Sequence, residues 1–271
     1  MFKISIILST YNRPDALRLV LNSLSYQDDK NFEIIVADDG SGESTKAEVD
    51  SFSGNHPYLH IKHVWQPDTG FRLARIRNLA VLSATGEYIV FLDGDCVVPP
   101  NFVSSHRSLA QKGWMVRGHR ILAGARFTED LLKDGLKRPI EFWNFSNLFQ
   151  LQFQKKINRI SPRILFPLNF WRLMTPKKWR KIKGCNWAMW KEDYLSVRGS
   201  DESFEGWGSE DCDVAVRLIN RGIGIKDGFG KSYVLHLWHK QSSRISEKKN
   251  LAIVEKRFAH KIIYPTKSMI K

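Results

Sequence analysis

The feature that most constrains the fold of this chain is an unbroken apolar run from Tyr88 to Leu92, with Gly86 before it and Gly94 after it. A short apolar run bounded in this way is typical of a strand that is buried on both faces of a parallel sheet. The tripeptide Asp-Gly-Asp occupies positions 93–95, directly after the run. Carboxylates at the carboxyl end of such a strand lie where open α/β sheets bind ligands.

The tripeptide itself has two interpretations. Asp and Gly are common turn formers, so it can simply end the strand. It also places two hard oxygen ligands near one point, which suits Mg²⁺ or Mn²⁺ bridging to a phosphate.

Strands and helices alternate through the first half of the chain. The apolar patterns predict strands over 3–10, 32–37, 61–65 and 88–92, and helices over 15–25, from 44 onward and over 72–83. This alternation predicts an α/β fold with a parallel sheet and right-handed crossovers. No glycine-rich phosphate or dinucleotide loop follows the first strand, so those two classes of nucleotide-binding protein are not expected.

Polar side chains follow each of three predicted strands. Ser9 to Arg13 follow the first strand, Asp38 and Asp39 the second, and Asp93 and Asp95 the fourth. Solvated loops would also be polar, but three polar strand ends on one sheet edge favour a binding site.

The net charge of +14 is concentrated in two segments. Residues 131–183 hold thirteen Lys or Arg against two acids, and residues 240–271 hold nine against two. Basic segments of this kind are typical of proteins that bind nucleic acid, anionic lipid or an acidic substrate. Three cysteines without metal-ligand spacing, no spanning apolar run and no signal-peptide pattern predict a cytosolic protein, with peripheral membrane attachment still open.

The basic segment 131–183 is also rich in aromatic residues, and its part 141–157 has the pattern of an amphipathic helix. This mixture suits a membrane interface or nucleic acid, or else a lid whose rings fill the core. Its rings are Phe142, Trp143, Phe145, Phe149, Phe153, Phe166, Phe170, Trp171 and Trp179.

In the second half, strands are predicted over 115–121, 184–190 and 233–240, and a basic tail helix over 247–263. Glu210 and Asp211 open a helix after a Gly-Trp-Gly loop, where acidic residues often serve only the helix dipole. His236 and His239 are either structural or the further ligands that an Asp-Gly-Asp metal site needs.

Together these motifs resemble inverting nucleotide-sugar glycosyltransferases of family 2 with the GT-A fold. The later segments resemble the acceptor-side motifs of β-1,4-galactosyltransferases and bacterial chondroitin-type polymerases. The segments that carry the resemblance are Ser9–Pro14, Asp38–Ser41, Gly70–Asn78, Asp93–Asp95, Gly184–Asn186 and Gly206–Asp211.

The resemblance implies a GT-A, Rossmann-like α/β fold with a mixed, mostly parallel sheet flanked by helices. Residues 1–241 would form one domain, and residues 242–271 a basic helical tail. Within the domain, residues 1–125 would bind the nucleotide-sugar, 126–183 would be the basic aromatic insertion and 184–241 would be the acceptor half.

The resemblance also assigns a donor side to the site. Asp95 would bind Mn²⁺ or Mg²⁺ directly, Asp93 would reach the metal through water or contact the ribose, and His236, or else His239, would complete the ligand set. The nucleotide-sugar would contact Thr10, Tyr11, Arg13, Asp38, Asp39, Arg75, Asn78 and Asp93.

On the acceptor side, Asp211 would be the general base and Glu210 would position the acceptor sugar. Trp207 would stack on a sugar face and Asn186 would contact the acceptor. Cys212 stands where the galactosyltransferases usually carry a third acid, which leaves the role of Asp213 open.

The implied reaction moves a sugar from a nucleotide-sugar, with a UDP-sugar as the expected donor, to a saccharide or lipid-linked saccharide in bacterial lipopolysaccharide, capsule or other surface-glycan synthesis. The basic aromatic insertion would dock the enzyme on the anionic inner face of the cell membrane. A soluble glycan acceptor is the alternative. A nucleic-acid-binding module would leave the carboxylates at three strand ends without a role, so no nucleic-acid partner is expected.

Overall fold

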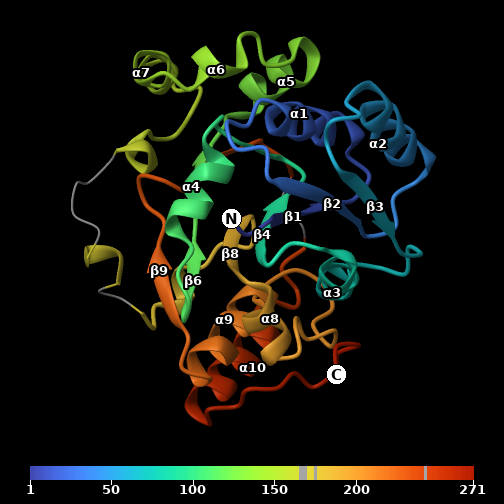
Figure 1. Ribbon diagram of the computed structural model, residues 1–271, viewed down its shortest axis with the longest axis vertical. Helices are drawn as coiled ribbons and strands as arrows, with labels where there is room; N and C mark the ends of the chain where they lie inside the picture. The colour runs from blue at the N-terminus through green and yellow to red at the C-terminus, as the bar shows by residue number, and fades with distance from the viewer. Residues whose placement is uncertain (165–169, 174–175, 241–242) are drawn as a thin grey trace.

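A mixed seven-stranded sheet forms the centre of the computed structural model, which describes residues 1–164, 170–173, 176–240 and 243–271 (Figure 1). The strand order is β3-β2-β1-β4-β8-β6-β9, and only β8 runs antiparallel to its neighbours. The predicted α/β class is therefore confirmed. The strands are β1 (Ile4–Thr10), β2 (Phe32–Asp38), β3 (Ile61–Trp65), β4 (Tyr88–Asp93), β6 (Trp114–Arg117), β8 (Asn186–Trp190) and β9 (Gly224–Asp227).

Two layers of helices cover the sheet because its central strands are apolar on both faces (Figure 1). On β1, Ile6 and Leu8 pack into one core and Ile7 packs into the other. The first core includes residues from α1 (Pro14–Ser25), α2 (Glu43–Asn55), α4 (Phe102–Leu109) and α5 (Ala125–Asp134). The second includes residues from α3 (Leu73–Ser83), α8 (Lys191–Ser196), α9 (Glu210–Asn220) and α10 (Glu247–Ala259).

A second, three-stranded sheet contains β5 (Cys96–Val97), β10 (Tyr233–His236) and β7 (His119–Leu122). The single strand predicted over 115–121 is wrong, since the chain leaves the large sheet at Gly118 and enters the small one. The Gly118 amide donates to the Asn186 carbonyl, and a Cβ at Gly118 would collide with the Asn186 side chain. Pairing of His236 with Cys96 in this small sheet brings the late histidines beside the Asp-Gly-Asp turn.

The basic aromatic segment is only partly what its pattern predicts. The helix expected over 141–157 is two shorter helices, α6 (Pro139–Phe142) and α7 (Phe145–Phe153), because Asn144 is extended between them. Short 3₁₀ turns follow at Ser161–Arg163, Phe170–Leu173 and Trp179–Lys181. Trp143 and Trp179 are buried in the two cores, so core filling explains these rings. The side chains of Phe166, Phe170 and Trp171 lie outside the described residues.

The C-terminal segment packs on the second core rather than projecting from it, and α10 ends at Ala259 instead of the expected 263. Arg257 of α10 pairs with Asp213 of α9 and with Asp201. Burial alone would raise the pKa of Asp201, but hydrogen bonds from Arg257, Ser203 and Thr266 outweigh it and lower the pKa to about 2. The last helix is thus fastened to the helix that begins with Glu210 and Asp211.

At the amino-terminal ends of the parallel strands, Glu33 of β2 joins β1 to the segment that precedes β4. Its carboxylate accepts hydrogen bonds from Ser5 Oγ at 2.6 Å, Thr85 N at 2.6 Å and Gly86 N at 3.0 Å. Burial raises the pKa of Glu33, but these donors and Lys3 outweigh it and lower the pKa from 4.5 to about 2.

Glu33→Gln should therefore lower the free energy of unfolding at pH 7 by about 1–3 kcal/mol, because an amide satisfies these donors less well than a carboxylate. A lowered folded-state pKa gives stability that is present above pH 4.5 and is lost as the pH falls toward 2. Urea unfolding at pH 7 and pH 3 would measure both effects. The exposed Glu87→Gln is the control, and an equal deficit at both pH values would contradict the assignment.

Candidate active site

The polar ends of β1, β2 and β4 meet at one edge of the large sheet. Thr10 pairs with Asp38 across β1 and β2, and Ser9 pairs with Asp93 across β1 and β4. Gly94 crosses this edge so closely that a Cβ there would lie 2.8 Å from the Ser9 carbonyl oxygen. Only glycine allows the turn that carries Asp95 to pass over the end of β1.

Several buried polar atoms at this edge form no hydrogen bond with the described residues. They are Ser9 Oγ, Thr10 Oγ1 and Arg13 Nη1. A buried polar group without a hydrogen bond is costly, so three of them at one edge favour a polar ligand. Thr10 and Arg13 are both predicted site residues.

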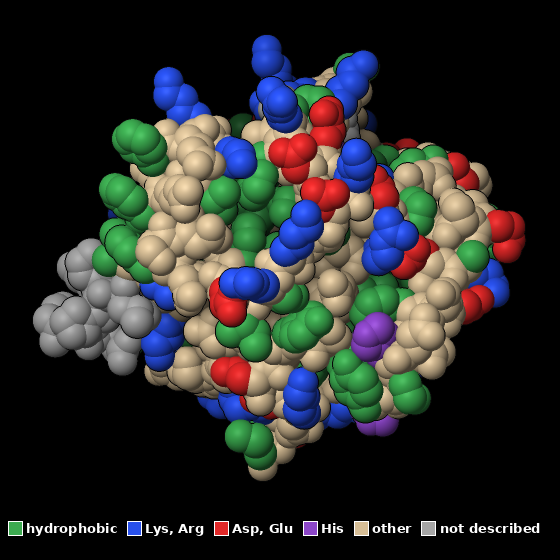
Figure 2. Space-filling model, turned by 90° about the horizontal axis from the view of Figure 1, so that it is seen from above, with side chains coloured by type: hydrophobic (Ala, Val, Ile, Leu, Met, Phe, Trp, Pro, Cys, Tyr) green, Lys and Arg blue, Asp and Glu red, His purple; other side chains and the backbone are tan. Residues whose placement is uncertain are grey.

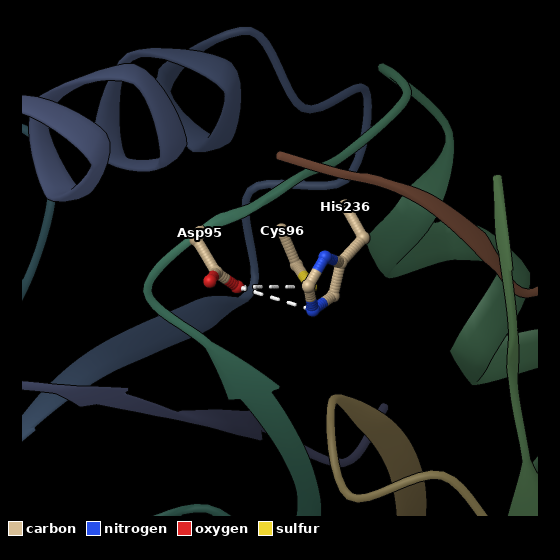
Figure 3. Close-up of side chains that lie close together, drawn as sticks. All are labelled: Asp95, Cys96 and His236. Carbon is tan, nitrogen blue, oxygen red and sulfur yellow. Dashed lines mark hydrogen bonds and ion pairs between the residues drawn. The ribbon is translucent and has the colours of Figure 1, made fainter. Parts of the chain in front are cut away.

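Asp95 lies at the centre of a group of imidazole and guanidinium nitrogens. Its carboxylate oxygens are 3.7 Å from His236 Nε2, 3.5 Å from His239 Nε2 and 3.7 Å from Arg13 Nη1. Figure 3 shows His236 and Cys96 turned toward Asp95 from β10 and β5. The structure thus brings both candidate histidines to the same carboxylate.

The hydrogen bonds of the two histidines fix their tautomers. Nδ1 of His236 lies 2.9 Å from the Leu237 carbonyl oxygen, and Nδ1 of His239 lies 2.9 Å from the Lys240 carbonyl oxygen. Because a carbonyl can only accept, each Nδ1 donates to its carbonyl, and Nε2 is the nitrogen that faces Asp95 and could offer its lone pair to a metal. Lone pairs and a carboxylate converging on one point fit a divalent cation, and a backbone carbonyl on the other nitrogen is the usual support of a metal-binding histidine.

Cys96 is also close, with its Sγ 3.6 Å from Asp95 Oδ1. Burial, Cys185 and the nearby carboxylates raise its pKa well above the ordinary value, so it remains a neutral thiol. Oxygen and imidazole ligands suit Mn²⁺ or Mg²⁺ better than a thiol. Among the described residues, the group whose ligand atoms all lie within 4.8 Å of one another is Asp95, Cys96 and His236. Ligand chemistry, rather than distance alone, therefore favours Asp95 and His236, with His239 at 3.5 Å from Asp95 taking the place of the thiol.

A second group of predicted residues surrounds the end of β2. Asp38 accepts from Ser41 N and contacts His63, whereas Asp39 accepts from Gln66 and from the Arg72 amide at 2.8 Å. Burial raises the pKa of Asp39.

Two more residues complete this group. The ring of Tyr11 is half exposed, and its hydroxyl donates to Asp68 at 2.8 Å. Arg75 donates to Gln66 at 2.6 Å and so borders the Asp39 cluster. An exposed ring beside a buried carboxylate offers a nucleobase both a stacking surface and a hydrogen-bond acceptor.

The third group lies at the start of α9. Ser209 and both glycines of the Gly-Trp-Gly loop have positive φ angles, which turn the chain sharply into the helix. Burial and the neighbouring Glu210 raise the pKa of Asp211 to about 6. A Cβ at Gly184 would lie 3.3 Å from Asp211 Oδ2, so the glycine leaves room beside the acids. Trp207 is partly exposed, with the Arg244 guanidinium 5.0 Å from its ring centroid.

Arg77 of α3 connects the first and third groups. Its guanidinium is buried and donates to Asp93 Oδ1 at 3.2 Å, Glu210 Oε1 at 3.1 Å and the Gly184 carbonyl at 3.0 Å. It was not among the predicted site residues. The sequence did hold a signal for its role. Arg77 adjoins the apolar stripe of the helix predicted over 72–83, where a solvated side chain is not expected.

Two of the predicted contacts fall on side chains that are buried and already hydrogen-bonded. The Asn78 amide group bonds to Tyr194, Ser200 and Glu202, so it is not available to a nucleotide. The Asn186 side chain packs beneath Gly118, where it accepts from Ser232 and lies 3.3 Å from His106 Nε2, and cannot reach an acceptor. Both asparagines instead join distant segments.

The open question about Asp213 has a structural answer. Its carboxylate is fully buried and is paired with Arg217 and Arg257, so it faces the protein interior. The acids available to a ligand at α9 are Glu210 and Asp211.

A separate hollow of about 770 Å³ lies between α5, α6 and α7. Acidic and basic side chains alternate around it, and none of the residues placed above lines it. The convergence of carboxylates, histidines and unpartnered polar atoms makes the sheet edge the candidate site.

Comparison with known families gives two adjoining matches. Residues 5–166 match "Glycosyl transferase family 2", and residues 168–240 match "N-terminal domain of galactosyltransferase". The first match covers the donor-side groups, and the second covers His236, His239, Glu210 and Asp211.

Relatives of known name are longer proteins. The chain is 28% identical over 234 residues to validoxylamine A glucosyltransferase of Streptomyces hygroscopicus subsp. jinggangensis, covering 81% of this chain and 52% of the relative. It is 30% identical over 231 residues to chondroitin synthase of Escherichia coli, covering 81% of this chain and 32% of that protein. The chain thus spans about half, or less, of the length of these relatives.

Solved structures share the fold. The chain superposes on S. aureus TarS 1-349 in complex with UDP with a TM-score of 0.63 and 17% identity, covering 98% of this chain and 67% of the other. The mannosyltransferase PcManGT from Pyrobaculum calidifontis, in complex with GDP-Man and Mn²⁺, superposes with a TM-score of 0.56 and 19% identity. The match covers 89% of this chain and 58% of the other.

Arg77→Met, which keeps the side-chain bulk but removes the charge, should lower the free energy of unfolding at pH 7 by about 3–5 kcal/mol, because Asp93 and Glu210 lose their buried counter-charge. The deficit should shrink at pH 5, because burial raises the pKa of Asp93 and its protonation removes part of the uncompensated charge. Urea unfolding at both pH values would measure this. Arg75→Met is the matched control and should cost far less, and equal effects of the two variants would contradict the bridging role.

Proposed function

Because the chain belongs to glycosyl transferase family 2, we propose that it moves a sugar from a UDP-sugar to a saccharide acceptor, with inversion at the anomeric carbon and with a bound Mn²⁺ or Mg²⁺ ion. The observation that carries the proposal is the pair of opposed groups at the sheet edge. Asp95 with two oriented histidines suits a metal and a diphosphate, and Asp211 with a raised pKa suits a base.

On the donor side, Tyr11 would stack on the uracil ring while Asp39 accepts from the base and Thr10 contacts the nucleoside. Asp93 would contact the ribose, or the ion through water. Arg13 and Arg75 would contact the diphosphate with charge-assisted hydrogen bonds. Arg13 Nη1 and Thr10 Oγ1 support this assignment, since both are buried and form no hydrogen bond among the described residues, and Arg13 Nη1 has only a 3.7 Å ion pair with Asp95.

The metal would be held by Asp95, His236 and His239. When bound, the ion would neutralise charge on the leaving diphosphate. The fixed Nδ1–H tautomers support both histidines as ligands. Structures of fold relatives with GDP-Man and Mn²⁺, with UDP and with UDP-GlcNAc are consistent with a nucleotide-sugar donor.

On the acceptor side, Asp211 would accept the proton of the attacking hydroxyl. A pKa of about 6 leaves the carboxylate mostly ionised at pH 7 and still basic enough to act. Glu210, held by Arg77, would bind the acceptor sugar, and Trp207 would stack on its face. The acids lie across Arg77 from Asp93, and attack opposite the leaving group is the geometry that inversion requires.

The wider role that we propose is synthesis of a bacterial surface glycan such as lipopolysaccharide or capsule, on a lipid-linked acceptor at the inner face of the cell membrane. The resemblance to a chondroitin synthase supports a glycan product. A soluble acceptor is the alternative. Within the described residues, no helix is long and apolar enough to cross a bilayer.

We keep the division of residues 1–125 as the donor half and 184–241 as the acceptor half, with 126–183 as the insertion. The C-terminal segment belongs functionally with the acceptor half, since Asn250 donates to the Gly208 carbonyl at 3.0 Å and so supports the Gly-Trp-Gly loop.

Asp95→Asn, His236→Ala and His239→Ala should each weaken Mn²⁺ binding, measured by calorimetry, and abolish or strongly reduce metal-dependent UDP-sugar hydrolysis. Cys96→Ala is the control and should retain the metal, because its thiol stays neutral. Excess chelator should stop turnover and added Mn²⁺ should restore it. Full activity in excess chelator would refute the metal assignment.

Asp211→Asn should reduce transfer by about 10²–10⁴-fold, the usual effect of losing a general base. UDP affinity should barely change, because the group faces the acceptor. For the wild type, kcat should fall as the pH drops through about 6, since the pKa is raised and only the ionised form accepts a proton. If Asp211→Asn kept the fall of kcat below about pH 6, or lost UDP affinity instead of transfer, Asp211 would not be the general base.

A further inference from the structure

Helix α7 is apolar on two faces. Leu148 and Leu151 point into the first core, whereas Phe145, Phe149 and Phe153 are 49%, 58% and 82% exposed. Residues four apart form a stripe along one side of a helix, so these rings make a continuous outer ridge. A surface helix in a globular protein needs only its inward stripe.

Further exposed apolar residues near α7 enlarge the apolar surface of this ridge. No residue of α7 is charged, and the nearby Ile140 and Ile164 are 61% and 45% exposed. Figure 2 views the molecule from the end where α5, α6 and α7 lie, and hydrophobic side chains protrude along one margin of that face. Exposed apolar residues gathered in this way mark an interaction surface.

Cations flank the ridge. Lys155 and Arg159 follow α7, are exposed and form no ion pair with any residue in the described ranges. The Arg163 guanidinium lies 5.9 Å from the Phe145 ring centroid. Two of the acids nearby are already paired, Asp134 with Lys137 and Glu141 with Arg138.

We propose that the outer ridge of α7, defined by Phe145, Phe149 and Phe153, inserts into the interface of an anionic lipid bilayer, with Lys155 and Arg159 at the level of the headgroups. Apolar rings beside cations are what interfacial helices use to bind such membranes. The inference deepens the proposed function, since it names the surface that would hold the enzyme beside a lipid-linked acceptor.

Charge favours a bilayer over a second copy of this chain. The net charge is +14, and residues 131–163, which include α7, hold seven Lys or Arg against two acids, so two copies meeting here would bring like charges together. An anionic surface is complementary to the same charges.

The docking helix is joined to the candidate metal ligands through backbone contacts. The Gly124 amide donates to the Lys156 carbonyl, and the Ala123 amide donates to the His236 carbonyl. Thr128 of α5 accepts from the Trp238 amide at 2.9 Å, between the two histidines. Docking through α7 would therefore hold the catalytic edge at a fixed position relative to the bilayer.

Sedimentation with vesicles tests the inference without measuring turnover. Wild type should bind phosphatidylglycerol vesicles at low salt, more weakly at 0.5 M salt, and barely bind phosphatidylcholine vesicles. The triple variant Phe145→Ser, Phe149→Ser, Phe153→Ser should bind at least tenfold more weakly while its thermal unfolding and its hydrolysis of free donor stay unchanged.

A charge control distinguishes this ridge from other basic surfaces. Arg180 pairs with Glu255 of α10, which places the 177–181 cluster at the end of the molecule opposite to α7 (Figure 1). Changing Lys177, Lys178 and Lys181 to Gln should therefore leave vesicle binding nearly intact.

Three results would overturn the proposal. Wild type could stay in solution with anionic vesicles at low salt, or the triple serine variant could bind as tightly as wild type. In the third, wild type would not bind vesicles, and sedimentation velocity would show a dimer that is absent in the serine variant. A second copy of the chain would then be what covers the α7 ridge. Loss of UDP-sugar turnover with vesicle binding retained would instead count against the proposed function alone.

Discussion

The guanidinium of Arg77 is the interaction on which the candidate site depends. It is buried between Asp93 and Glu210, with the Phe91 and Trp187 rings 5.7 and 5.8 Å from it. Taking a carboxylate out of water is expensive unless a counter-charge and hydrogen bonds replace the water. One planar cation with several donors meets that requirement on both sides, so the donor and acceptor groups can approach each other without their negative charges forcing the strand end and the helix start apart.

The parts of the site that the sequence predicted are those whose signal is local. An apolar run fixes where β4 ends, so the place of Asp93 and Asp95 followed from the run and from the rule that parallel strands end at one edge. Arg77 lacks such a signal, since its partners are 16 and 133 residues away. Asn78 shows the reverse case, because a motif match cannot tell a polar side chain that faces a ligand from one that fastens two buried segments.

The same distinction applies to the fold. Strand and helix positions in the first half depend on periodicity and were predicted within one or two residues, whereas the break at Gly118 depends on the Asn186 side chain from another strand. For His236 and His239, spacing indicated that both were candidates. Their tautomers depend on carbonyls made available by the end of β10, which no local pattern encodes.

The pairing of Arg257 with Asp201 and Asp213 has a consequence for how the protein assembles during translation. The strands β1, β2 and β4, which carry Thr10, Asp38 and Asp93 to the sheet edge, leave the ribosome well before Arg257. Asp213, two residues beyond Asp211, must then remain near water until Arg257 emerges, because Arg217 alone satisfies only one of its two carboxylate oxygens. A nascent chain would thus carry the acids of α9 before the cation that fixes this helix to α10 has been made.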